Sequence, residues 1–153
     1  MAGHAFETLH GAGQDVGLKL CGMHMMDAGR IEKGFRHFGH DITCEDHVLE
    51  AGLGFAVKVD KLDFIGRDAV LRKKETGLSK RLVQFKLTDP EPLLYHNEPV
   101  MRDGEVVSYL TSGVYGHHLG AAMGMAFMTR QERGRRPDSA LLFAKAWYFE
   151  AFL

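Results

Sequence analysis

The sequence is poor in the features that mark secreted, membrane-spanning or nucleic-acid-binding proteins. Its 153 residues include two cysteines, Cys21 and Cys44, too few for a disulfide framework, so reduced thiols inside a cell are expected. No apolar run approaches the roughly 18 residues of a bilayer span, so no membrane segment is predicted. Nineteen basic and twenty acidic residues leave a net charge of -1, which predicts no basic patch for nucleic acid or a membrane surface.

The composition is otherwise that of a folded globular protein. Hydrophobic residues make up 45% and charged residues 25% of the chain, which suits one domain or two small domains sharing a boundary. The N-terminus has no basic segment followed by an apolar one, so no secretory signal is predicted. Eighteen glycines against four prolines indicate many tight turns.

Two catalytic or cofactor motifs are missing. Gly11, Gly13 and Gly17 approach a dinucleotide fingerprint, but Val16 stands where the third glycine is needed and no strand precedes them. We interpret these glycines as a helix end and a turn. No serine lies in a Gly-x-Ser-x-Gly elbow and neither cysteine has a recognisable motif, so nucleophilic catalysis is not predicted. Ser112 is instead predicted to be a turn residue.

Nine histidines are many for this length and raise the question of a metal site. Ligand types suited to zinc occur together at His37, His40, Cys44 and His47. The segment lacks a Cys-x-x-Cys pair or a His-Glu-x-x-His helix, so we favour surface histidines in a polar loop and predict no metal. His117 and His118 are adjacent, and on a strand they would point to opposite faces.

The first half of the sequence is predicted to be helical, interrupted by glycines. The spacing of apolar residues predicts a helix around 6–12, a strand at 16–20, a helix ending near Gly34, a strand at 55–59 and a helix at 63–74. Gly77 is placed to end the last helix, and the basic residues near its C-terminus suit the helix dipole.

The second half is predicted to be antiparallel β-structure. Alternation predicts a half-buried strand at 81–87, and Asp103-Gly104 predicts a hairpin between strands at 100–102 and 105–107, the second continuing through 109–111. We also predict a turn at 89–92, a short apolar run at 123–128, a turn at 131–137 and an apolar stretch at 141–153. We place a boundary near Gly77.

The segment 30–36 carries the densest local chemistry. Glu32 lies among three cations and beside the apolar residues Ile31 and Phe35. A carboxylate in such a place can stay ionised and accept two parallel hydrogen bonds from a planar heterocycle. The alternative is a solvated helix end with local ion pairs worth less than about 1 kcal/mol each, and the segment alone favours that alternative.

Several motifs in continuous order resemble a known family. They are Arg30-Ile31-Glu32-Lys33-Gly34-Phe35-Arg36, Gly39-His40-Asp41, Leu49-Glu50-Ala51-Gly52-Leu53 and Asp63-Phe64-Ile65-Gly66-Arg67, then Asn97-Glu98-Pro99, Arg102-Asp103-Gly104 and Thr111-Ser112-Gly113. Together they resemble the folate-binding family of the glycine-cleavage T-protein, and more closely the C-terminal folate half of dimethylglycine and sarcosine dehydrogenases. The resemblance runs over residues 5–128.

This resemblance implies an α+β fold. Residues 1–77 are expected to form the C-terminal part of a T-protein-like folate-binding domain. Residues 78–153 are expected to form a small antiparallel β-barrel with a truncated or divergent tail, so the barrel would be incomplete. An open barrel edge exposes unpaired strand backbone, which favours a homodimer or a heteromer with a chain carrying the N-terminal half.

The resemblance also implies a role in one-carbon transfer with tetrahydrofolate. In the family the carboxylate at the position of Glu32 holds the pterin ring, and Arg30 and Phe38 belong to the same expected cofactor site. Lys61 occupies the place of a folate-contacting arginine, which keeps the cation and loses the bidentate fork. We therefore expect a reduced-folate-binding part of an aminomethyltransferase or methylated-glycine dehydrogenase.

Other positions depart from the family pattern. No segment matches the one that carries the catalytic aspartate, and FAD is expected only in a missing domain or a partner. Val48, Gly29 and Ser108 replace the usual proline, apolar residue and glycine. A non-catalytic folate-binding module or a structural remnant therefore remains an alternative to an enzyme part. The expected compartment is the cytoplasm, or the mitochondrial matrix in a eukaryote.

Overall fold

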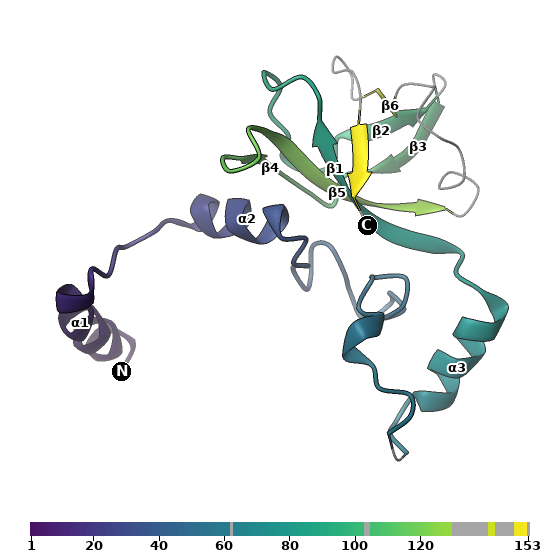
Figure 1. The fold of residues 1–153 in the computed structure, drawn as a ribbon, viewed down its shortest axis with the longest axis horizontal. Coiled ribbons are helices and arrows are strands. Elements are labelled where there is room, and N and C mark those ends of the chain that lie inside the picture. The colour runs from purple at the N-terminus through teal and green to yellow at the C-terminus, as the bar shows by residue number, and fades with distance from the viewer. Residues whose placement is uncertain (62, 103–104, 130–140, 143–148, 153) are drawn as a thin grey trace.

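A computed structural model describes residues 1–61, 63–102, 105–129, 141–142 and 149–152 (Figure 1). Its helices are α1 (Ala2–Gly13), α2 (Met23–Glu32) and α3 (Arg67–Thr76), with 3-10 turns at Gln14–Val16 and Gly54–Ala56. Its strands are β1 (Lys80–Leu87), β2 (Pro99–Arg102), β3 (Glu105–Tyr109), β4 (Ser112–Gly116), β5 (Ala121–Thr129), β6 (Leu141–Leu142) and β7 (Phe149–Phe152). None of the helices in this described part is long and apolar enough to cross a membrane.

The strands form two antiparallel sheets. One has the order β4-β5-β1-β7 and the other has the order β3-β2-β6. The longest pairing joins β1 to β5, from Lys80 opposite Thr129 to Lys86 opposite Met123. No ladder of hydrogen bonds joins the two sheets among the described strands, so these strands form an open barrel.

Strand β5 is buried on both faces, and this places α2. Its residues 121–126 are all buried. One face joins the barrel core around Phe85, whereas Met123 and Met125 on the other face pack with Leu82 and with Ile31 of α2. A strand covered on both sides is expected to be apolar throughout, as this one is. Helix α2 therefore covers the outer face of the sheet.

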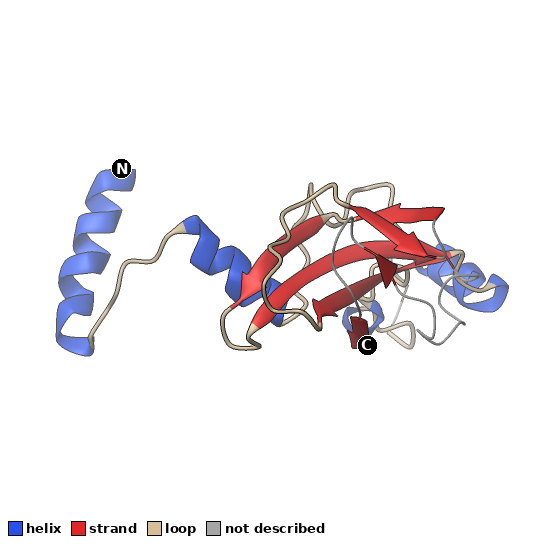
Figure 2. Cartoon of the chain, turned by 90° about the horizontal axis from the view of Figure 1, so that it is seen from above, coloured by secondary structure: helices blue, strands red, loops and turns tan. Residues whose placement is uncertain are grey.

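The N-terminal region is far less packed than the sheets. Helix α1 buries only Gly13. Figure 2 shows α1 standing apart from the strands, connected to α2 by an extended segment. Helix α3 lies toward the other end of the molecule in the same view and buries Val70.

Several expected elements are confirmed. The strand expected at 81–87 is β1, the apolar run at 123–128 lies in β5, and the two hairpin strands are β2 and β3. Gly77 ends α3 with a φ of 84°, a left-handed conformation that favours glycine. The turn residues 103–104 and the expected turn at 131–137 lie outside the described residues, as does most of the stretch 141–153.

Other expectations were wrong. The strand expected at 16–20 is the end of a 3-10 turn followed by irregular chain, and the one expected at 55–59 overlaps the 3-10 turn Gly54–Ala56. The local spacing of apolar residues alone predicted them, and neither segment pairs with a neighbouring described strand. Helix α3 begins at Arg67 rather than near 63, because Gly66 takes a φ of 89°.

Three smaller corrections concern the region around β4. Ser112 begins this strand rather than forming a turn, and β3 ends at Tyr109 rather than continuing through 111. The buried Leu110 separates the two strands, and its N–H binds the Glu98 carbonyl at 2.9 Å. His117 and His118 lie in the turn after β4, so the strand argument about their directions does not apply.

Candidate functional site

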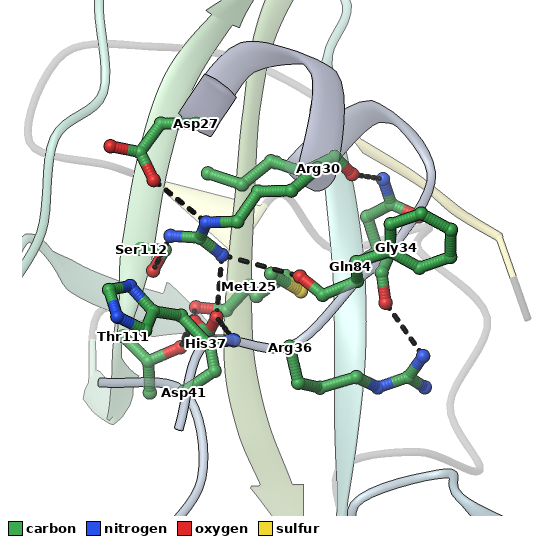
Figure 3. A network of polar contacts seen from close by, with 12 residues as sticks. Asp27, Arg30, Gly34, Arg36, His37, Asp41, Gln84, Thr111, Ser112 and Met125 are labelled. Carbon is green, nitrogen blue, oxygen red and sulfur yellow. Dashed lines mark hydrogen bonds and ion pairs between the residues drawn. The ribbon is translucent and has the colours of Figure 1, made fainter. Parts of the chain in front are cut away.

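Arg30 is the centre of a polar network beneath α2 (Figure 3). Its guanidinium donates to Asp27 Oδ1 and Asp41 Oδ2, each at 2.7 Å, and to Ser112 Oγ at 2.9 Å. A longer bond of 3.3 Å reaches the Phe35 carbonyl. All three nitrogens of the guanidinium thus bind protein acceptors.

Asp41 is the buried partner in this network, with 1% of its surface exposed. Besides Arg30, its Oδ2 accepts the His37 N–H at 2.8 Å, and its Oδ1 accepts the Thr111 hydroxyl at 2.7 Å. A buried carboxylate is costly unless it is paired and hydrogen-bonded, and both conditions hold here. The network therefore ties α2 and the following loop to the start of β4.

Arg36 fastens the next part of the same loop. It donates from Nε to the Ala51 carbonyl at 2.9 Å and from one terminal nitrogen to the Gly34 carbonyl at 2.6 Å. Gly52 has a φ of 72°, a conformation that favours glycine, and a Cβ there would also approach the Arg36 guanidinium. Burial lowers the pKa of Arg36, nearby Asp41 raises it, and the like charge of Arg81 lowers it.

Glu50 anchors the approach to β1. This carboxylate is 4% exposed, and its Oε1 accepts Lys73 Nζ at 2.9 Å, the Ser79 hydroxyl at 2.8 Å and the Ser79 N–H at 3.0 Å. Burial raises its pKa, but these bonds and the N–H of Lys80 together outweigh burial and lower the pKa to about 2. Glu50 is therefore an ionised structural residue.

Glu32 lies at the C-terminal end of α2 and is half-buried. Its Oε1 accepts the backbone N–H of His118 at 2.7 Å, from the turn between β4 and β5. Gln84 of β1 donates to the Ile31 carbonyl and fixes the end of the helix (Figure 3). No other described residue donates to the Glu32 carboxylate, so this group retains acceptor capacity for a ligand.

The predicted site residues divide into two groups. Arg30 and Glu32 lie on one helix and both reach the β4 region, Arg30 through Ser112 and Glu32 through His118. Phe38 is 69% exposed and lies in the loop that follows, and Lys61 is exposed in a turn before α3. No hydrogen bond or ion pair joins Lys61 or Phe38 to Glu32 among the described residues.

A cavity of about 380 Å³ opens along α2 and β4. Its walls come from α2, from the segment 93–95 and from β4 with the residue after it: His24, Met25, Ala28, Leu93, Leu94, Tyr95, Gly113, Val114, Tyr115 and His117. His117 directly precedes the residue whose N–H binds Glu32. The cavity is mostly apolar with a few polar groups, as small-molecule sites commonly are.

The polar contacts around Arg30 and Glu32 also include residues to which the sequence alone assigns no role. Asp41 was visible only as part of a motif, and Thr111 and His118 lie 70 and 86 residues from their partners Asp41 and Glu32. Pairs so distant in sequence leave no local signal. Within the described residues, no group of three His, Cys, Asp or Glu side chains is arranged to hold a metal.

Comparison with known proteins identifies the family. The GCVT N-terminal domain model matches residues 1–61, and the glycine cleavage T-protein C-terminal barrel domain model matches residues 80–139. The chain belongs to the glycine-cleavage T-protein family. Its relatives include both aminomethyltransferases and enzymes of the dimethylglycine dehydrogenase type, which confirms the resemblance seen in the motifs.

Three relatives illustrate this range. The chain is 47% identical over 127 residues to 4-methylaminobutanoate oxidase (formaldehyde-forming) of Paenarthrobacter nicotinovorans, 41% over 123 residues to an aminomethyltransferase of Halothermothrix orenii, and 35% over 140 residues to the mitochondrial dimethylglycine dehydrogenase of Homo sapiens. These alignments cover 82%, 80% and 90% of this chain. The chain spans only 15%, 34% and 16% of the respective relatives.

A solved structure supports the fold. The aminomethyltransferase T of the glycine cleavage system from Bartonella henselae superposes with a TM-score of 0.79 at 22% identity, covering 95% of this chain and 41% of that one. The α+β class with a C-terminal barrel domain is thus confirmed, and the described strands leave the barrel open, which agrees with the expected incomplete barrel.

Proposed function

We propose that this chain forms the tetrahydrofolate-binding part of an aminomethyl-transfer enzyme, of the glycine-cleavage T-protein or methylated-glycine dehydrogenase type. The observation that carries the proposal is the Glu32 carboxylate. It is half-buried at the end of α2, held by one backbone N–H, and receives no other hydrogen bond from a described residue. Membership in the T-protein family supports a reduced folate as the ligand.

The chemistry of Glu32 fits a pterin ring. A pterin presents adjacent N–H donors in one plane, and a carboxylate can accept two such bonds in parallel. One bond from His118 leaves lone pairs on both oxygens, so the paired interaction is still available. Bound tetrahydrofolate supplies the acceptor for the one-carbon unit. The task of Glu32 is then to orient the ring.

The other expected folate residues receive different roles in this proposal. The guanidinium of Arg30 is engaged with protein acceptors, so it positions α2 and Glu32 rather than contacting folate. Phe38 and Lys61 have exposed side chains and are assigned to the outer part of the ligand. The domain division near Gly77, with residues 1–77 on the folate side, belongs to the same proposal.

Catalysis in this proposal depends on groups outside the chain. The catalytic aspartate comes from the N-terminal half of the family fold, and FAD belongs to a further domain or a partner chain. Exposed apolar side chains at Val16, Leu20 and Met23 support an association, as a homodimer or a heteromer. The compartment is proposed to be the cytoplasm or the mitochondrial matrix.

A calorimetric titration with 5-formyltetrahydrofolate tests the proposal. We expect saturable one-to-one binding, weakened at least about tenfold in Glu32→Ala because a charge-assisted contact is lost. Lys33→Ala is a matched control, since this neighbour is exposed and its side chain makes no hydrogen bond or ion pair with another described residue. Thermal melts establish that all three proteins fold. A folded wild-type chain without a heat of binding, or equal affinity in both variants, would contradict the proposal.

Light scattering after size exclusion tests the association. We expect a mass above that of the 17.1 kDa chain at micromolar concentration. A single 17.1 kDa species over the whole concentration range would exclude the homodimer. Mixing with a chain that carries the N-terminal half of the family fold then tests the heteromer.

A further inference from the structure

The turn between β4 and β5 donates a backbone hydrogen bond to the Glu32 carboxylate. Its residues 117–120 follow β4, and the N–H of His118 meets Glu32 Oε1 at 2.7 Å. The donor is a backbone group, so the contact depends on the path of the turn and not on the identity of a side chain. One oxygen of an otherwise mobile Glu side chain is thereby given a fixed place.

Gly116, the last residue of β4, leaves room for this contact. A Cβ at this position would lie 3.1 Å from Glu32 Oε1 and 2.9 Å from Met123 Cγ. Both distances are shorter than ordinary van der Waals contact, and Met123 is buried in the core between α2 and the sheet. A side chain at position 116 would therefore displace the carboxylate or the methionine.

The C-terminal end of α2 is also held by strand β1. Gln84 of β1 donates to the Ile31 carbonyl, and Ile31 packs against Met123 and Met125 of β5. The backbone of α2 at Glu32 is thus fixed by β1 and β5, while the carboxylate is fixed by the turn.

We infer that Gly116 and the backbone N–H of His118 are positioning elements for the pterin-binding carboxylate. The barrel sheet then contributes to folate affinity without touching folate, by holding Glu32 in its binding rotamer. This inference rests on the proposed function, since it assigns Glu32 to the ligand. A ligand group that needs both carboxylate oxygens in one plane is more sensitive to this positioning than a single-point contact is.

Two substitutions test the inference on the full chain with 5-formyltetrahydrofolate as the probe. His118→Pro removes the N–H, and His118→Ala keeps it. Gly116→Ala introduces the colliding Cβ, and Gly29→Ala is its control because a Cβ at Gly29 meets nothing within 4 Å. We expect His118→Pro and Gly116→Ala to weaken binding roughly tenfold, the scale of one charge-assisted hydrogen bond, and the two matched variants to bind as the wild type does.

A double-mutant cycle separates positioning from general destabilisation. In a Glu32→Ala background, His118→Pro is expected to change folate affinity less than about twofold, because the group that it positions is already gone. A purely structural effect would weaken binding by the same factor in both backgrounds and would overturn the inference.

Amide exchange supplies a readout that needs no ligand. We expect the His118 N–H to exchange at least about tenfold faster in Glu32→Ala than in the wild type, because its acceptor is lost. Unchanged exchange would overturn the inference even if Gly116→Ala failed to fold. If Glu32→Ala weakens binding but His118→Pro does not, the positioning role fails and the proposed function stands. If the folded wild type does not bind, both fail.

Discussion

The β1–β5 pair and the N-terminal segment 1–26 are both rich in apolar residues, but the pair buries these residues and the segment leaves them exposed. In the pair, Phe85 and Leu82 are 2% and 1% exposed. In the N-terminal segment, Phe6, Leu9 and Val16 are 53%, 70% and 82% exposed. The difference lies in what each segment packs against and not in its composition. The strands find partners within this chain, whereas the described N-terminal segment finds almost none.

This contrast separates apolar residues that stabilise the fold by packing within it from apolar residues that remain exposed on the described structure. Scattered exposed apolar side chains are ordinary, whereas those of α1, the connecting segment and the start of α2 follow one another closely in sequence, and the proposed association would cover them. Glu32 and Arg30 lie where the two kinds of region meet. Helix α2 buries Ile31 against β5 and leaves Met23, 67% exposed, on its other end.

The largest expected effect comes from truncating the core. Phe85→Ala should lower the free energy of unfolding by about 4 kcal/mol, from lost burial and the cavity left behind. Phe6→Ala, at the exposed end of the comparison, should change it by less than about 0.5 kcal/mol. Urea denaturation followed by circular dichroism measures both. Similar losses in the two variants would show that α1 is packed in solution.

Breaking the network beneath α2 should cost nearly as much. Asp41→Ala leaves the guanidinium of Arg30 without its buried partner, and removing one member of such a pair costs about 3 kcal/mol or more. Asp27→Ala removes the other carboxylate that binds Arg30. The Asp27 side chain is 31% exposed, so this substitution should lower the free energy of unfolding by less than about 1 kcal/mol. Equal effects in urea denaturation would contradict the assignment of Asp41 as the buried anchor.

Low pH should lower the free energy of unfolding because Glu50 becomes protonated. Its pKa falls from the ordinary 4.5 to about 2 in the folded chain, so the folded state favours the ionised form. The resulting stabilisation, up to about 3 kcal/mol, is complete above the unfolded pKa and is lost as pH falls from near 4.5 toward about 2. Denaturation at several pH values measures this slope.

Glu50→Gln is the control for that measurement. It should flatten the slope between these pH values and lower stability at neutral pH, because the amide cannot accept Lys73 as a carboxylate does. Part of the slope should remain, since Asp46 also has a lowered pKa: burial raises it, but Lys80 and Thr43 outweigh burial. An unchanged slope would show that Glu50 is not the titrating group.

The sequence predicted the elements whose signals are local. The alternation at 81–87, the hairpin strands and the glycine that ends α3 depend on neighbours a few residues away, and all three are confirmed. The same kind of signal failed at 16–20 and 55–59, because a strand needs a partner that the local apolar pattern does not specify.

The candidate site divides in the same way. Glu32 stood out because cations and apolar residues surround it in the sequence. Its contact with His118 did not, because the two residues are 86 positions apart and one partner is a backbone N–H. Asp41 likewise acquires its role only when Thr111 and Arg30 are brought to it by the fold.

A small expected effect of removing α1 sharpens the comparison from the exposed side. Deleting residues 2–13 removes α1, which buries only Gly13, so the free energy of unfolding should change by less than about 1 kcal/mol. Leu18 donates its N–H to the Gly13 carbonyl at 2.9 Å, and its side chain lies beside Gly13. Leu18→Ala in the full chain keeps this N–H and removes the side chain, so it is the matched control for the packing of Leu18 against the end of α1. Urea denaturation of the deleted chain should retain both midpoint and slope. A fall of several kcal/mol would mean that α1 contributes to the fold, and the apolar surface of residues 1–26 would then belong to a core and not to an association surface.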